Sequence, residues 1–258
     1  MSPQEEALVS AFARSMPPEY RSAFDAEARR AHAEIVARRG SRRTHVEIWQ
    51  ELSERLVAIC VVADDRAGLL SSISAALVGC RIDVVRADAY CRRRDDGKIE
   101  AVDLLWIRRL PDANGLVPPL HARDIVQVAE ALERAADPAA AAGPDSTRVR
   151  TAAEEPTPSG SSARIRFEKS PKDGATILTV EAKDRPGLLL AVTQALFRAG
   201  LQIIGLRATT EKGAAVDRFT LAEPDGGPLR QERLLTLQTA ILGALDEGAL
   251  APHRRSAG

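Results

Sequence analysis

Two short motifs of the same design contain the side chains that are best suited to binding a small ligand. Asp65 and Asp184 each follow an apolar run, and each is followed by Arg, by Ala or Pro, and by Gly68 or Gly187. A glycine lets a ligand approach the backbone, and the unpaired N–H groups at the start of a helix attract an anion such as an α-carboxylate. Because the aspartate can accept an α-ammonium, the motifs predict a site for a free amino acid.

Two further polar residues belong to the predicted site. Asp83 and Gln202 stand at the start of the strand that follows each helix, where they can bond the ligand backbone or a side-chain amide. We expect Asp83 to repel the carboxylate of an amino acid in the first motif, which makes the second motif the better candidate. The complete set of ligand-binding candidates is Asp184, Arg185, Pro186, Gly187, Leu188, Gln202, Asp65, Gly68, Leu69 and Asp83.

Each of these features also has a purely structural explanation. An aspartate ahead of a helix is more often its N-cap, and we favour that explanation for either motif taken alone. Pro186 is compatible with a first helical turn, and the glycines serve a turn as readily as a ligand. Arg66 and Arg185 are expected to be solvated rather than ligand-binding.

The sequence contains no pattern that is typical of catalysis or metal binding. Its three cysteines have no C-x-x-C spacing, its four histidines are scattered singly, and its adjacent carboxylate pairs fall at turns or in polar segments. We therefore expect no catalytic residue, no metal and no cofactor. The 36 basic residues balance the 36 acidic ones, which argues against a nucleic-acid partner. No apolar run approaches the ~18 residues of a membrane span, so we expect a cytoplasmic protein without a membrane partner.

An internal repeat supplies the elements that position these motifs. Asp184 follows Asp65 by 119 residues, and the same offset aligns Ala89 with Ala208. Each copy predicts a strand, a helix, a two-stranded hairpin and a second helix. The ranges are 56–62, 69–77, 82–90, 99–107 and 122–135 in the first copy, and 176–180, 188–196, 201–209, 214–221 and 230–245 in the second.

A short alternating run before each copy, at 45–49 and 164–167, predicts an additional first strand. The predicted fold class is α+β, with two ferredoxin-like domains in a permuted β-β-α-β-β-α order and antiparallel four-stranded sheets. Pairing of the two sheets, within one chain or in a homodimer, would give eight strands and bury exposed edges. We expect a helical segment at 1–43, in which Asp25 can cap a helix at 26–39, domains at 44–136 and 163–247, a disordered linker at 137–162 and a tail at 248–258.

The motif Asp184-Arg-Pro-Gly-Leu-Leu189, with Gly200-Leu-Gln-Ile203 and Ala215-Val-Asp-Arg-Phe219, resembles ACT domains, which are small regulatory modules that bind amino acids. The chain from about Met16 to Leu245 further resembles the C-terminal ACT pair of bacterial PII uridylyltransferases. Ala67 departs from the Pro that is usual in this family. The nucleotidyltransferase and HD motifs of the uridylyltransferase family do not occur in this sequence.

This resemblance implies a non-catalytic regulatory protein of nitrogen or amino-acid metabolism that senses an amino acid, with glutamine as the expected ligand. Occupancy would change how the chain meets a regulated protein partner. One alternative is an ACT module that only dimerises or docks a protein and binds no ligand. Another is a fragment or homologue of a PII uridylyltransferase.

Overall fold

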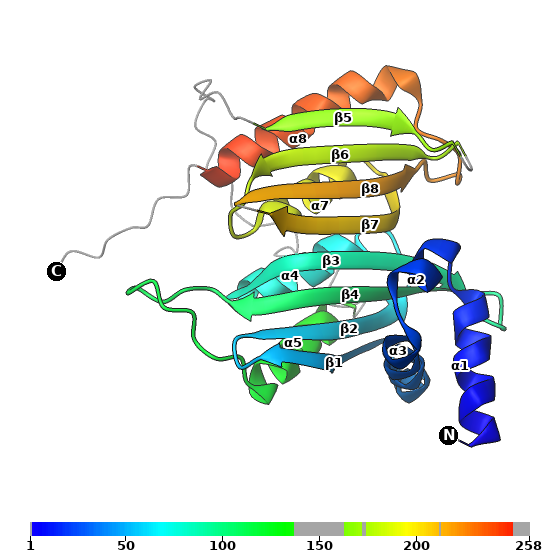
Figure 1. Cartoon of the computed structure of the whole chain (residues 1–258). Helices are drawn as coiled ribbons and strands as arrows, with labels where there is room; N and C mark the ends of the chain where they lie inside the picture. The colour runs from blue at the N-terminus through cyan, green and yellow to red at the C-terminus, as the bar shows by residue number, and fades with distance from the viewer. Residues whose placement is uncertain (1, 137–162, 172–173, 212, 250–258) are drawn as a thin grey trace.

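The computed structural model describes residues 2–136, 163–171, 174–211 and 213–249 (Figure 1). A helical segment leads into two units of the same β-β-α-β-β-α order, which confirms the predicted fold class. The leading helices are α1 (Pro3–Ser15), α2 (Pro18–Ala23) and α3 (Ala26–Arg39). The predicted linker, 137–162, and residues 250–258 of the tail lie outside the described residues, and the domain boundaries stay a prediction.

Unit one and unit two follow the repeat element by element. Unit one contains β1 (Thr44–Ser53), β2 (Leu56–Asp64), α4 (Leu69–Gly79), β3 (Ile82–Arg93), β4 (Ile99–Arg109) and α5 (Ala122–Ala135). Unit two contains β5 (Arg164–Lys169), β6 (Thr176–Lys183), α7 (Leu188–Arg198), β7 (Gln202–Glu211), β8 (Ala214–Ala222), a 3₁₀ turn (Gln231–Arg233) and α8 (Leu234–Ala249). The extra first strand of each copy is therefore present as the hairpin partner of the second.

The two units share one eight-stranded sheet in the order β1-β2-β4-β3-β7-β8-β6-β5. The inner strands β3 and β7 pair antiparallel and join the units within a single chain, as Figure 1 shows at the centre of the molecule. Of the two arrangements predicted for the sheets, this is the intramolecular one.

One face of the sheet carries α4, α5, α7 and α8 above a continuous apolar core. Alternate residues of β2 point into this core, including Val57, Ile59 and Val61, and Leu178 and Val180 of β6 do the same in unit two. Because a single cluster of buried side chains extends through both units, they pack as one body rather than as two separate cores.

The opposite face of unit one is covered by α1, α2 and α3, which form a second core with the other residues of β2, Ala58, Cys60 and Val62. With both faces covered, β2 is apolar almost throughout. Trp49 and Trp106 pack here against Phe24. In unit two the repeat positions of Ala58, Cys60 and Val62 are held by Ile177, Thr179 and Glu181. The outer face of unit two is therefore more polar, and α2 reaches only its edge, beside Arg207 of β7.

Two side chains of the leading helices are buried and bonded in this second core. The Tyr20 hydroxyl and the His32 Nδ1 atom lie 2.8 Å apart, and both side chains are fully buried. Burial lowers the pKa of His32 to about 3, so its imidazole is neutral. The Asp25 carboxylate caps α3 by accepting a hydrogen bond from Ala28 N–H at 2.9 Å, and α3 has the predicted bounds.

Candidate functional site

Two pockets lie where unit one meets unit two, and each combines a loop of one unit with a strand of the other. The Asp65 pocket is formed by residues 65–71 with Cys91 and Asp103 of unit one, and by Phe197 and 201–205 of unit two. The Asp184 pocket is its counterpart, formed by 184–185, 187–190 and Asp217 of unit two and by 82–85 of unit one.

The two pockets differ in size. The Asp65 pocket has a volume of about 120 Å³ and the Asp184 pocket about 30 Å³. Since a single water molecule needs ~10–15 Å³ by this measure, the Asp65 pocket has room for a ligand of several heavy atoms, and its counterpart holds about two waters.

The loop at each pocket depends on its glycine. Gly68 and Gly187 have φ angles of 75° and 78°, a left-handed conformation that strains other residues. These glycines are themselves the N-cap residues of α4 and α7, so the interpretation of Asp65 and Asp184 as N-caps is wrong. The N–H groups in the first turn of each helix have no partner within the helix and face the loop side, where an anion can accept from them.

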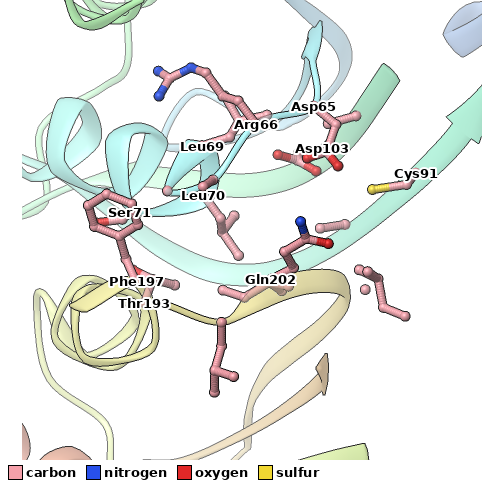
Figure 2. A pocket seen from close by; sticks show the side chains of 18 of the residues that line it. Asp65, Arg66, Leu69, Leu70, Ser71, Cys91, Asp103, Thr193, Phe197 and Gln202 are labelled. Carbon is pink, nitrogen blue, oxygen red and sulfur yellow. The ribbon is translucent and has the colours of Figure 1, made fainter. Parts of the chain in front are cut away.

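A buried carboxyl group lies inside each pocket. Asp103, in the middle of β4, is 3% exposed, and burial, together with the nearby charge of Asp65, raises its pKa to about 8. Asp65 lies at the mouth of the pocket, where the surrounding atoms raise its pKa and the Cys91 thiol hydrogen-bonds its carboxylate. Figure 2 shows Asp65 and Asp103 side by side, with the Gln202 side chain extending toward them from β7.

The Asp184 pocket has a related buried carboxyl but a different opposite wall. Burial, with a smaller contribution from the charge of Asp184, raises the pKa of Asp217 to about 7. Asp83 faces it from unit one and binds Arg108, with Nη2 and Oδ2 2.9 Å apart. The buried Ser74 hydroxyl has no hydrogen-bond partner among the described residues. This pocket is thus narrower and richer in carboxylates.

The structure corrects how the predicted residues group. Gln202 lies in the pocket of Asp65, and Asp83 lies in the pocket of Asp184, because each pocket takes its strand from the opposite unit. The expectation that Asp83 would repel a ligand at the first motif is therefore wrong. Asp83 would instead repel the carboxylate of a ligand bound at the second motif. The preference for the second motif loses its main argument, and the Asp65 pocket becomes the stronger candidate.

The remaining predicted residues lie in the core or at the rim of the pockets. Leu69 and Leu188 are buried, with side chains in the shared core, and their N–H groups donate to the carbonyl oxygens of Arg66 and Arg185, so they offer a ligand no free donor. Arg66 is exposed, as predicted, and its Nη2 atom lies 3.5 Å from the Ala135 carbonyl oxygen at the end of α5. Arg185 is half-buried and donates to the Leu245 carbonyl oxygen of α8 at 2.5 Å. Pro186 is exposed beside it.

Several lining residues were not among the predicted ones. Asp103 and Asp217 occupy equivalent positions of the repeat, at an offset of 114. A single carboxylate in the middle of an apolar strand, present in both copies, is a signal that would have identified them. Cys91 and Phe197 carry no comparable signal, since their place in the pocket depends on how distant strands pair.

Neither a metal cluster nor a membrane helix accompanies the pockets. Across residues 2–136, 163–171, 174–211 and 213–249, no three His, Cys, Asp or Glu side chains gather closely enough to hold a metal ion. A bilayer-spanning helix is not found in the same part of the chain.

The chain is similar over most of its length to part of a larger bacterial enzyme. The bifunctional uridylyltransferase/uridylyl-removing enzyme of Phenylobacterium zucineum is 27% identical over 97% of this chain and 26% of its own length. The enzyme of the same name from Gluconobacter oxydans is 29% identical over 93% of this chain and 25% of its own length. The chain thus spans about a quarter of these relatives, and the resemblance inferred from its motifs is confirmed.

Comparison with family models and with solved structures adds no assignment for the chain. No family model matches the chain. A crystal structure of an unknown protein from Galdieria sulphuraria is 19% identical and covers 76% of this chain and 94% of its own, with a TM-score of 0.23. The fold is shown by the order of the elements and by the pairing of the strands in this chain.

Proposed function

We propose that this chain is a non-catalytic regulatory protein of the ACT type that binds a free amino acid, glutamine, in the Asp65 pocket. One observation carries the proposal. The Asp65 pocket has carboxyl groups on one wall, and on another wall it has the N–H groups at the start of α4, which no side chain caps. The carboxyl groups complement the α-ammonium of an amino acid, and the N–H groups complement its α-carboxylate.

Each part of the ligand has a partner in this pocket. The α-ammonium binds Asp65 and Asp103, and the α-carboxylate accepts from the N–H groups of Leu70 and Ser71 in the first turn of α4. Gln202 comes from the other unit and carries an amide, which can exchange a donor and an acceptor with a second amide. A side-chain amide on the ligand is therefore favoured, which supports glutamine and sets aside amino acids with apolar side chains.

The pocket adjoins a network of ion pairs that holds the leading helices to the sheet. Arg39 of α3 binds Asp64 at 2.7 Å and Glu100 at 2.5 Å; Asp64 directly precedes Asp65, and Glu100 belongs to β4, a strand that lines the pocket. Arg92, next to Cys91, binds Glu100 at 2.7 Å and the Ser15 hydroxyl of α1 at 3.0 Å. A ligand that moves Asp65 or Cys91 can thus shift α1 and α3 relative to the sheet. We propose that a protein partner binds to the surface of these leading helices.

Calorimetric titration of the full chain with glutamine and the other common amino acids tests the proposal. We expect saturable binding of glutamine at millimolar concentration or below. Gln202→Leu should weaken it about tenfold or more, the loss of roughly one hydrogen bond to a buried partner. The matched control is Asp83→Asn, at the same repeat position in the other pocket, which should leave binding unchanged.

Proton release gives a second readout. Because Asp103 has a pKa of about 8, it is mostly protonated at pH 7 in the empty pocket, and a bound ammonium favours its ionised form. Binding at pH 7 should release a proton, seen as a dependence of the binding heat on the ionisation enthalpy of the buffer. No binding by any amino acid would reject the proposal and leave the docking module without a ligand as the function.

A further inference from the structure

The junction of β3 and β7 places two equivalent residues of the repeat against each other. Asp88 pairs with Arg207 in the strand register, and Arg207 follows Asp88 by the 119 residues that relate the two copies. Of the pairs in this ladder, Asp88 and Arg207 alone occupy one and the same repeat position. They therefore lie on the pseudo-two-fold axis that relates unit one to unit two.

The two residues on the axis have opposite charges and are bonded. Asp88 is fully buried, and its Oδ1 atom accepts from Arg207 Nε at 3.3 Å. Its Oδ2 atom accepts from Arg86 Nη2 at 2.6 Å. The side chain of Arg207 is 55% exposed and that of Arg86 is 40% exposed, so both cations approach the buried carboxylate from the solvent side.

Symmetry determines what any other pairing of these edges would bring together. If the β3 edge met the β3 edge of a second chain, Asp88 would face another Asp88 in a buried position, each with only its own Arg86. If β7 met a second β7, Arg207 would face Arg207, with Gly205 and Thr209 as the flanking residues of the ladder. Like charges directly opposite in antiparallel strands are destabilising, and a buried carboxylate that loses a counter-ion is costly.

We propose that the Asp88–Arg207 pair selects the partner at this edge: unit one accepts unit two and rejects a second copy of itself. Since the pair lies outside both pockets and involves none of their lining residues, the proposal is independent of ligand binding. The partner that fits the β3 edge is a ferredoxin-like unit with a cation at this one position.

Charge reversal in the full chain tests the selection. Arg207→Asp places a carboxylate opposite Asp88 and should lower the urea midpoint of unfolding, and Asp88→Arg/Arg207→Asp should restore most of it. Arg55→Asp is the matched control, because Arg55 is exposed in the turn between β1 and β2, at the outer edge of unit one and away from the junction, so its midpoint should stay near that of the unaltered chain. Should an arginine not fit the buried position, Asp88→Asn/Arg207→Asp removes the like-charge contact without added bulk and should recover part of the loss.

Mixing single variants tests rejection directly. Asp88→Arg chains carry two cations on the axis and Arg207→Asp chains carry two anions, so complementary pairs form only between different chains. After joint refolding, light scattering and native mass spectrometry should show a 1:1 complex of twice the chain mass as the main species. The proposal is overturned if Arg207→Asp unfolds at the midpoint of Arg55→Asp, if neither double variant recovers stability, or if the mixture holds no more dimer than each variant alone.

Discussion

At the scale of single residues, Asp103 is the group that most distinguishes the Asp65 pocket from an ordinary crevice. It lies in an otherwise apolar strand between Val102 and Leu104, both fully buried. A carboxyl in such a place is kept neutral by burial unless a cation arrives. At high pH the ionised Asp103 therefore destabilises the protein when the pocket is empty, and a bound ammonium group removes this cost.

Replacing Asp103 by Asn should make the empty protein more stable at pH 8. The folded-state pKa of about 8 lies above the unfolded value of 3.8, so the contribution of Asp103 is fully present below pH 4 and is lost as pH rises to 8. The loss is ~1.4 kcal/mol for each pH unit, and Asn does not suffer it. Urea unfolding at several pH values measures the difference, which should vanish near pH 4.

Asp95→Asn is the control for this prediction, because Asp95 is exposed in the β3–β4 turn. It should leave the pH dependence of unfolding unchanged. An Asp103→Asn protein whose stability falls with pH as steeply as the unaltered chain would show that another group titrates.

The sequence identified several residues of the pocket but not how they group. Asp65, Gly68 and Gln202 were all named, and they lie together. Their grouping was wrong because Gln202 is 137 residues from Asp65 along the chain, and only the pairing of β3 with β7 brings them into one pocket. Local pattern carries no information about such a contact.

At the scale of elements, the turns that lead into α4 and α7 have the same backbone but different surroundings. A Cβ added to Gly68 would lie 2.8 Å from Cδ2 and Cε2 of Phe197, whereas one added to Gly187 would meet nothing within 4 Å. Phe197 is half-exposed and projects from α7 over the loop of the other unit. The loop of the Asp65 pocket is thus held from both sides of the junction.

Gly187→Ala and Gly68→Ala should therefore differ. Both put alanine in a left-handed conformation, which costs about 1–2 kcal/mol. Gly68→Ala should lose a further ~1 kcal/mol, because the half-exposed Phe197 ring must leave its preferred rotamer to make room, and urea unfolding measures both losses. Adding Phe197→Leu to Gly68→Ala should remove most of that excess. Equal losses in the two single variants would contradict the close contact.

Helices and strands followed closely from the periodicity of the sequence. The predicted helix at 122–135 and the capped helix at 26–39 have the bounds of α5 and α3. The predicted helix at 230–245 begins with a 3₁₀ turn instead, and α8 starts at Leu234. Apolar spacing identifies such elements because it records the face that meets the core, but it is less informative at their ends.

At the scale of the whole molecule, the joined sheet and the shared core make the two units one cooperative body. Both tryptophans, Trp49 and Trp106, belong to unit one, whereas far-ultraviolet circular dichroism reports on both units. We expect the two signals to give the same urea midpoint, because opening unit two alone would expose the β3 edge and part of the common core. A fluorescence midpoint well apart from the dichroism midpoint would show that the units unfold separately.

Carrying both copies on one chain has a consequence for how the protein can change over generations. In a homodimer of a single unit, every substitution appears in both pockets. Here each pocket combines the loop of one copy with the strand of the other, so a substitution at Gln202 alters one pocket and a substitution at Asp83 alters the other. Duplication therefore allows a substitution to change one pocket without changing the other, and the two pockets do differ, with volumes of about 120 and 30 Å³.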